Sequence, residues 1–284
     1  MAVLLRRVVT GRDSAAQEGP VFRGYLQIGS IGRIMIPPAS PQTMAQVHFS
    51  ALSDRWSSAA NNDAFCAERI GKYHVFAVAE GLSDFPGAGS ASGIAVSCLR
   101  EILQGRKGTP AALLEETVHE SELRIIAHIG KSAEMARDAT ILSAGLVDDQ
   151  LDCTILDTGE GNAYLIDTGR ILIPQDYPVP GQPGSAGSHP LNGDEKKRSD
   201  MISRALGEPR MLRSSDFVTL NIRGRYLLLS SGGLHDFVRK ERIAEIVLRN
   251  GENVDTSCEH LLQEALSGGS ERTITLVLVH GHLH

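Results

Sequence analysis

The sequence has no paired cysteines and no long apolar run, and each absence excludes a class of protein. Its four cysteines are scattered singly, without a C-x-x-C or any zinc spacing, which favours free thiols in a reducing cytoplasm. No apolar segment approaches the roughly 20 residues that cross a bilayer. In the opening segment the arginines follow the apolar residues, the wrong order for a secretory signal. These features predict a soluble, cytoplasmic protein without a membrane partner.

The sequence also lacks an excess of basic residues. Its formal net charge is -6 at pH 7, whereas proteins that bind phosphate backbones usually present a basic face. We therefore expect no nucleic-acid partner. Hydrophobic residues make up 42% and charged residues 22% of the chain, which is ordinary for a globular protein and sufficient for a substantial core.

Two regions are punctuated by proline and glycine. Residues 1–45 contain "GSIGRIMIPPASPQ", which breaks any long element, so we predict an N-terminal extension with one or two short strands before a main domain over 46–284. Residues 174–200 also lack periodicity. Long irregular segments inside compact domains are usually functional flaps or disordered, so this segment is predicted to be a mobile flap.

The remaining patterns alternate between strand and helix. Period-two or continuous apolar patterns predict strands, and apolar residues at helical spacing predict helices. Asp and Gly at each break of residues 139–173 are typical of turns between antiparallel hairpins. The further predicted strands are 44–54, 73–82, 216–222, 226–231 and 272–280, and the predicted helices are 91–104, 110–134, 240–250 and 254–266. This order favours an α+β fold, a strand sandwich with helices on its outer faces.

Acidic residues follow several of the predicted strands. Asp63 lies in "NNDAF", Glu80 and Asp84 lie just past a buried strand, and Asp236 follows the turn in "YLLLSSGGLHDFV". Carboxylates at the mouth of a sheet are frequent ligands, but turn and cap acids are equally common there. Taken singly, none of these acids identifies a site.

Taken in order, the motifs resemble the metal-dependent serine/threonine protein phosphatases of the PPM (type 2C) family. The resemblance is co-linear over residues 47–280. It rests on "SSAANNDAF", "FAVAEGLSDFPGAGSAS", "ARDATILSAGL", "DTGEGNAYLI", "ISRALG", "YLLLSSGGLHDFV" and "RTITLVLV". It implies a four-layer α-β-β-α sandwich of two antiparallel sheets flanked by helices, and a role in signalling. In that family two Mg²⁺ or Mn²⁺ ions held by carboxylates generate the attacking hydroxide.

Carried over position by position, the resemblance retains few of the family's metal ligands. The residual candidates for metal binding are Asp63, Glu80, Gly81 and Asp236. The substituted positions are Ser58 (phosphate-binding Arg in the family), Asn62, Gly232 and Arg272 (acids in the family). Glu80 replaces the bridging Asp and is longer by one methylene.

The resemblance therefore implies a pseudophosphatase that acts by binding or regulation, with no metal cofactor and with a phosphoprotein or regulatory protein as partner. We expect the guanidinium of Arg272 to pair with Asp63 or Glu80 in place of a metal. The alternative is an active phosphatase in which Asp63, Glu80, Asp84 and Asp236 rearrange around a single Mg²⁺ or Mn²⁺ ion.

Two further patterns compete with this interpretation. The segment "GAGSASG", residues 87–93, is one residue off the dinucleotide-binding fingerprint and begins several residues beyond its strand, so we set it aside. The tail "HGHLH" could place His280, His282 and His284 on one strand face as a metal clip. Terminal residues are usually poorly ordered, so we expect a frayed terminus instead.

Overall fold

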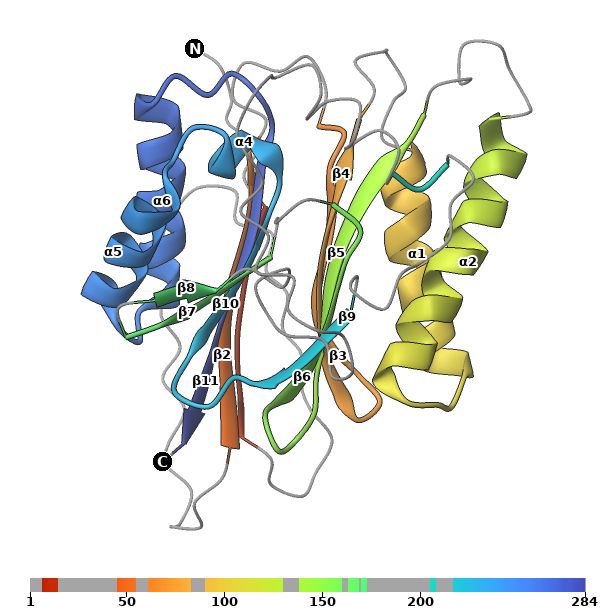
Figure 1. Cartoon of the computed structure of the whole chain (residues 1–284), viewed down its shortest axis with the longest axis horizontal. Helices are drawn as coiled ribbons and strands as arrows, with labels where there is room; N and C mark the ends of the chain where they lie inside the picture. The colour runs from red at the N-terminus through yellow and green to blue at the C-terminus, as the bar shows by residue number, and fades with distance from the viewer. Residues whose placement is uncertain are drawn as a thin grey trace, which may run out of the picture.

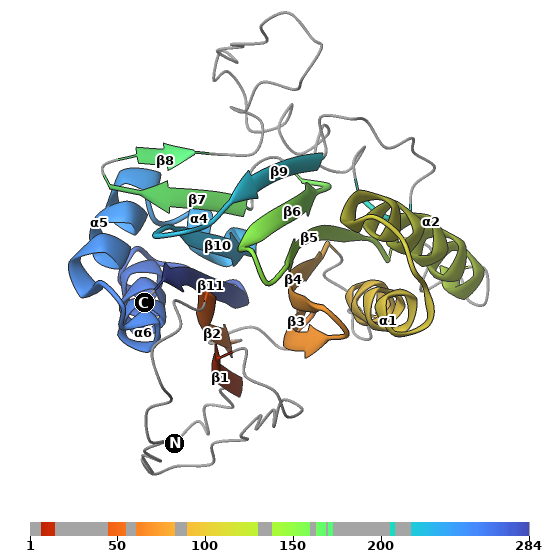
Figure 2. The same cartoon turned by 90° about the horizontal axis from the view of Figure 1, so that it is seen from below.

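The computed structural model contains two antiparallel sheets packed face to face, with helices on both outer faces (Figure 1). This arrangement confirms the predicted α+β sandwich. The view from below separates the four layers, with α5 and α6 on one side and α1 and α2 on the other (Figure 2). The structure describes residues 7–14, 45–54, 61–82, 90–129, 138–159, 163–168, 170–172, 205–207 and 217–283. The predicted flap at 174–200 lies outside them.

The first sheet has six strands in the order β1-β2-β11-β10-β7-β8, and every neighbouring pair is antiparallel. Its strands are β1 (Arg7–Ser14), β2 (Ala45–Asp54), β7 (Ala163–Asp167), β8 (Arg170–Leu172), β10 (Tyr226–Ser230) and β11 (Ile274–Leu283). Strand β1 lies within the predicted N-terminal extension and pairs with β2 over its whole length.

The second sheet has five strands in the order β3-β4-β5-β6-β9, again all antiparallel. Its strands are β3 (Ala64–Ile70), β4 (Tyr73–Gly81), β5 (Thr140–Val147), β6 (Asp152–Asp157) and β9 (Phe217–Asn221). The sequence predicted a hairpin between β6 and β7. This prediction is wrong, because β7 belongs to the other sheet. Asp and Gly residues are therefore compatible both with a tight turn within one sheet and with a connection between two sheets.

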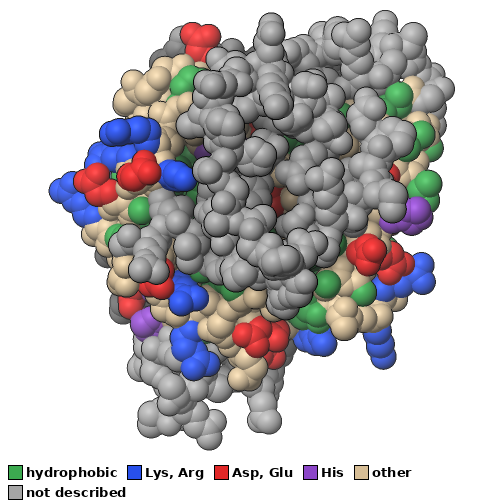
Figure 3. Space-filling model, in the orientation of Figure 1, with side chains coloured by type: hydrophobic (Ala, Val, Ile, Leu, Met, Phe, Trp, Pro, Cys, Tyr) green, Lys and Arg blue, Asp and Glu red, His purple; other side chains and the backbone are tan. Residues whose placement is uncertain are grey.

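Helices α1 (Ser90–Gly105) and α2 (Pro110–Ile129) cover the second sheet, and α5 (Lys240–Asn250) and α6 (Val254–Ser267) cover the first. A short helix, α4 (Gly232–His235), follows β10 directly. None of the helices in the described residues combines the length and apolar character that a membrane crossing requires. On the face shown in Figure 3, cationic and acidic side chains are interspersed beside α5 and α6. Arg242, for example, pairs with both Glu245 and Glu264.

Strand β4 shows how the alternation of side chains separates two layers of core. Val75, Ala77 and Ala79 pack with the cluster under α1 and α2, whereas Phe76 and Val78 pack between the two sheets. Successive side chains of a strand point to opposite faces, so Glu80 continues the inner face between the sheets. The pattern that makes β4 a buried strand thus delivers a carboxylate to the mouth of the sandwich.

The C-terminal tail departs from its prediction. Strand β11 continues to Leu283 and pairs with β2 along its full length, so the expected fraying of "HGHLH" is wrong for residues 280–283. Chain ends are usually poorly ordered, but here the pairing with β2 orders the last strand. His284 lies outside the described residues.

Candidate functional site

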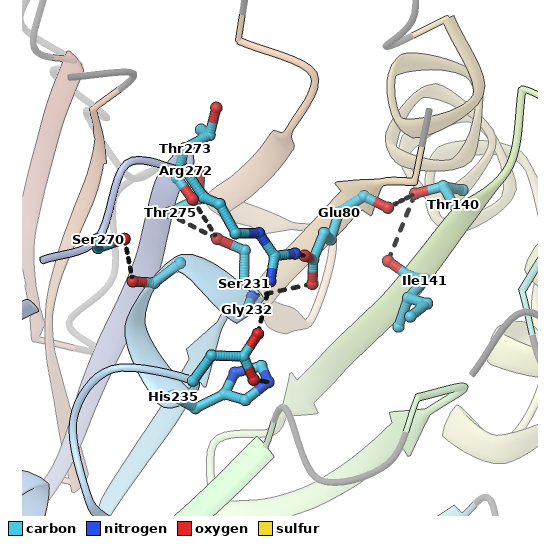
Figure 4. Close-up of polar contacts among 12 residues, drawn as sticks. Glu80, Thr140, Ile141, Ser231, Gly232, His235, Ser270, Arg272, Thr273 and Thr275 are labelled. Carbon is cyan, nitrogen blue, oxygen red and sulfur yellow. Dashed lines mark hydrogen bonds and ion pairs between the residues drawn. The ribbon is translucent and has the colours of Figure 1, made fainter. Parts of the chain in front are cut away.

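The acids predicted from the sequence meet at one end of the sandwich, where three segments converge (Figure 4). Glu80 comes from the end of β4 in the second sheet, Gly232 begins α4 after β10, and Arg272 lies two residues before β11 of the first sheet. The site therefore bridges the two sheets. This position follows from the fold, since β10 and β11 are neighbours and β4 faces them across the inner core.

Glu80 is the buried centre of the site, with a side chain only 4% exposed. Its Oε1 accepts a hydrogen bond from Nη2 of Arg272 at 2.5 Å, and its Oε2 accepts one from the backbone N–H of Gly232 at 2.9 Å. The hydroxyl of Thr140 donates to the backbone carbonyl of Glu80 at 2.8 Å and fixes the strand end. A buried charge is costly unless it is paired and hydrogen-bonded, and here both carboxylate oxygens have donors.

Arg272 joins two acids through its two terminal nitrogens. Nη2 contacts Glu80, and Nη1 donates to Oδ2 of Asp236 at 2.5 Å. The sequence predicted a pairing with Asp63 or Glu80, and the structure places the ion pair on Glu80; the second partner, Asp236, was not expected. The side chain of Arg272 is 45% exposed, so the guanidinium closes the site from the solvent side.

Gly232 and Gly233 have no room for a side chain. A Cβ atom on Gly232 would lie 2.8 and 2.9 Å from the two terminal nitrogens of Arg272 and 2.9 Å from Oε1 of Glu80. A Cβ on Gly233 would lie 2.0 Å from the backbone oxygen of Thr273. At Gly233 the close atom belongs to the backbone, so glycine is required there. At Gly232 the close atoms are the ends of two side chains that hold each other in an ion pair. The guanidinium of Arg272 and the absence of a side chain at Gly232 therefore depend on each other.

Asp63 lies beside this group without joining its ion pairs. Its Oδ2 is buried and has no hydrogen-bond partner among the described residues. Burial and, next, the charge of Glu80 raise the pKa of Asp63 to about 7, while Thr275, Ser231 and Arg272 lower it. Close to neutral pH a substantial fraction of this carboxyl is therefore protonated.

Asn62 and Gly81 meet through their backbones. The carbonyl of Asn62 accepts a hydrogen bond from the hydroxyl of Ser92 at 2.6 Å, and a Cβ on Gly81 would lie 2.4 Å from that same oxygen. Gly81 therefore packs against the segment that carries Asp63. Ser58, Asp84 and residues 160–162 of the resembling hairpin lie outside the described residues.

The sequence analysis missed a set of hydroxyls behind Asp63. Ser53 and Thr275 share a hydrogen bond of 2.8 Å, and the backbone N–H of Thr275 donates to the hydroxyl of Ser231 at 2.9 Å. Each of these residues lies at or next to a strand end, and Ser53 is directly opposite Thr275 in the pairing of β2 with β11. Serine and threonine at strand ends were the available signal.

Within the described residues, no three His, Cys, Asp or Glu side chains are arranged so that they could hold a metal ion. A cavity of about 470 Å³ lies between α5 and α6. It does not include the acids, so the geometry of the ion pairs defines the candidate site better than the cavity does.

Comparison with solved structures shows that this fold occurs in bacterial serine/threonine phosphatases. The Mycobacterium tuberculosis serine/threonine phosphatase PstP/Ppp has a TM-score of 0.64 and 21% identity, over 82% of this chain and 98% of that chain. The catalytic domain of PstP in complex with two manganese ions has a TM-score of 0.64 and 22% identity, over 84% and 99%.

PppA, a key regulatory component of T6SS in Pseudomonas aeruginosa, has a TM-score of 0.63 and 17% identity, over 83% of this chain and 97% of that chain. No protein-family model and no curated protein matches the sequence. The likeness confirms the four-layer fold expected from the resemblance.

Proposed function

We propose that this chain is a pseudophosphatase of the PPM (type 2C) family, which acts by binding or regulation and not by metal-dependent hydrolysis. The observation that carries the proposal is the guanidinium of Arg272, which lies between Glu80 and Asp236 in hydrogen-bond contact with both. In the proposal this fixed cation takes the role that metal ions have in active relatives.

The described residues do not fit a pair of divalent cations. Mg²⁺ and Mn²⁺ require oxygen ligands, chiefly carboxylates, but both oxygens of Glu80 already accept hydrogen bonds. A divalent ion within about 4 Å of the guanidinium would be repelled by several kcal/mol at an effective dielectric constant of about 20.

We also propose a phosphoprotein or a regulatory protein as the partner, and the cytoplasm as the location. The fold is retained over nearly the whole length of the phosphatases it resembles, which supports a binding surface inherited from a phosphoprotein-binding enzyme. One of these neighbours is itself described as a regulatory component.

One observation favours the alternative, an active phosphatase with a single ion. Oδ2 of Asp63 is buried without a hydrogen-bond partner among the described residues, and such an oxygen is a suitable metal ligand. An ion there would recruit Glu80 or Asp236 only after Arg272 had moved away. Asp84, the fourth acid of this alternative, lies outside the described residues.

The deciding experiment is a calorimetric titration of the full chain with Mn²⁺ beside a hydrolysis assay on phosphoserine peptides. We expect no binding heat attributable to the site and no turnover at millimolar Mn²⁺. The control is the Asp63→Ala variant, because contaminating phosphatase activity would survive it. A turnover that persists through purification and disappears in Asp63→Ala would establish the single-ion enzyme instead.

A further inference from the structure

Helices α5 and α6 form a groove on their side of the sandwich (Figure 1). Two cavities of about 470 and 400 Å³ share Arg242, Glu264 and Ser267 in their lining, so they make one continuous groove, the α5–α6 groove. It extends from Arg239, just before α5, to Arg249 near the end of that helix. At about 1.5 Å per helical residue, these two arginines are roughly 15 Å apart along the helix axis.

The groove has more positive than negative side chains, although the chain as a whole has a net charge of -6. Its charged lining among the described residues consists of Arg239, Arg242, Arg249 and Glu264. Arg242 binds Glu264 through two hydrogen bonds of 3.0 Å and contacts Glu245 at 2.9 Å. Arg239 and Arg249 are exposed and form no ion pair within the part of the chain that the structure describes. One cation at each end of the groove is therefore available to an anionic partner.

The polar lining of the groove adds a hydrogen-bond donor. Nδ2 of Asn250 donates to the carbonyl of Ile246 at 2.9 Å, which identifies it as the amide nitrogen, and it lies 3.2 Å from Nδ1 of His260. Nδ1 of this exposed histidine is therefore the acceptor, and the hydrogen of the neutral ring is on Nε2. Together with the guanidinium of Arg249, this donor suits carboxylate oxygens, which only accept hydrogen bonds.

Apolar side chains form the floor of the groove and one of its ends. Ile246 is 5% and Val238 3% exposed, and both contribute to the lining. Phe237, a large apolar side chain that is 36% exposed, lines the same cavity as Arg239. A small inorganic anion would leave this apolar surface uncovered, whereas a peptide can place an apolar side chain on it. Phe237 also follows Asp236 in the chain, so this end of the groove lies next to the ion-pair site.

We propose that the α5–α6 groove binds an acidic, extended peptide segment of a partner protein. An extended chain advances roughly 3.3 Å per residue, so two acidic residues about four positions apart would reach Arg239 and Arg249. An apolar residue between them would cover Ile246, which gives the apolar centre and polar rim typical of interfaces.

The charge of the whole chain favours a short segment over a larger anionic surface. A net charge of -6 repels nucleic acid or an anionic membrane over a long range. A short peptide interacts mainly with the groove itself, because charges beyond about 8–10 Å are screened at physiological salt. The proposal rests on the binding role proposed above, but it uses none of the residues that form the ion-pair site.

The test is a fluorescence-anisotropy titration of the full chain into a labelled peptide with two glutamates at the spacing given above and a leucine between them. We expect saturable binding that weakens as salt is raised. Arg239→Gln and Arg249→Gln should each weaken binding by about two- to fivefold, the contribution of an exposed ion pair. Because the two positions are well separated, the double variant should lose about the product of the two effects.

Arg106→Gln is the matched control, because Arg106 is an exposed arginine just after α1, on the opposite outer face of the sandwich. It removes the same charge and should bind the peptide as the unaltered chain does. All of these positions are exposed, so the variants should fold, and thermal melts check this. A peptide with glutamine in place of glutamate should bind at least about fivefold more weakly.

The proposal is overturned if the chain does not bind the acidic peptide, if the double variant binds it as tightly as Arg106→Gln does, or if the glutamine peptide binds equally well. Binding to vesicles of phosphatidylserine and phosphatidylcholine without binding to the peptide would identify a membrane surface and also overturn it. Because none of these measurements involves Mn²⁺ or hydrolysis, their failure is distinguishable from failure of the pseudophosphatase proposal.

Discussion

The two ends of β11 differ in how the polar groups buried there are paired. At its start, Arg272 neutralises Glu80 and Asp236, and Gly232 has no space for a side chain beneath the guanidinium. At its other end, the imidazoles of a histidine cluster, His48, His280 and His282, are 5.7 to 6.5 Å apart and include a buried nitrogen of His280 without a hydrogen-bond partner among the described residues. Ten residues of strand separate these ends by roughly 30 Å. The first end pairs its acids with a cation of the chain, whereas at the second end the imidazoles stack on one another and on Tyr226.

The largest effect should come from removing that internal cation. Arg272→Ala leaves the carboxylate of Glu80 buried without its partner, so we expect the free energy of unfolding to fall by about 3 kcal/mol. Thermal and denaturant melts measure the loss. Millimolar Mn²⁺ should partly restore the melting temperature of the variant but leave the unaltered chain unchanged, because the vacated acids can then accept the ion.

A second change separates this explanation from general damage. In the double variant Glu80→Gln/Arg272→Ala the unpaired charge at position 80 is also removed, so the loss should be smaller than in Arg272→Ala alone. The contrast between the two ends of β11 fails if Arg272→Ala has the melting temperature of the unaltered chain and Mn²⁺ does not change it. The guanidinium would then be only a surface group.

Gly232→Ala should have the next largest effect, about 2 kcal/mol, because the new Cβ would press on Arg272 and Glu80. The same substitution in the Arg272→Ala background should cost less, since two of the three close contacts are gone. Gly93→Ala in α1 is the matched control, where a Cβ meets nothing within 4 Å. There we expect a gain of about 0.5–1 kcal/mol. Equal losses at Gly232 in both backgrounds would contradict the proposed dependence.

The sequence predicted the elements of this fold better than their connections. The pattern of residues 240–250 coincides with α5, and the apolar run at 73–82 with β4. The crossing from β6 to β7 was mistaken for a hairpin, because the Asp-Gly break reports a change of direction and not which sheet the next strand joins. Local chemistry carries no information about that choice.

The site divides in the same way. Motif order placed Glu80 and Arg272 together, as the ion pair shows. It did not indicate that Asp236 shares the guanidinium or that Ser231 and Thr275 lie behind Asp63, because these contacts depend on how α4 turns after β10. The sequence indicated only part of the histidine cluster. His280 and His282 lie in one motif, but His48 becomes their neighbour only through the register of β2 and β11.

Asp63 should give a smaller, pH-dependent effect. Its pKa rises from 3.8 to about 7 in the folded chain, so its contribution to stability is present below pH 3.8 and is lost as the pH rises through 7. Asp63→Asn removes the titration. Its gain in unfolding free energy should therefore be larger at pH 8 than at pH 4. Melts of both proteins across this range test the expectation, and parallel curves would show that Asp63 is not desolvated.

The smallest effect is expected at the other end of β11, and it sharpens the comparison most. His282→Asn should change the unfolding free energy by less than about 0.5 kcal/mol, because exposed pairs such as its 3.5 Å contact with Glu252 contribute little. Thermal and denaturant melts of both proteins measure the difference. A loss above about 2 kcal/mol would mean that the histidines stabilise the sheet as Arg272 stabilises the site, and that both ends of β11 are structural.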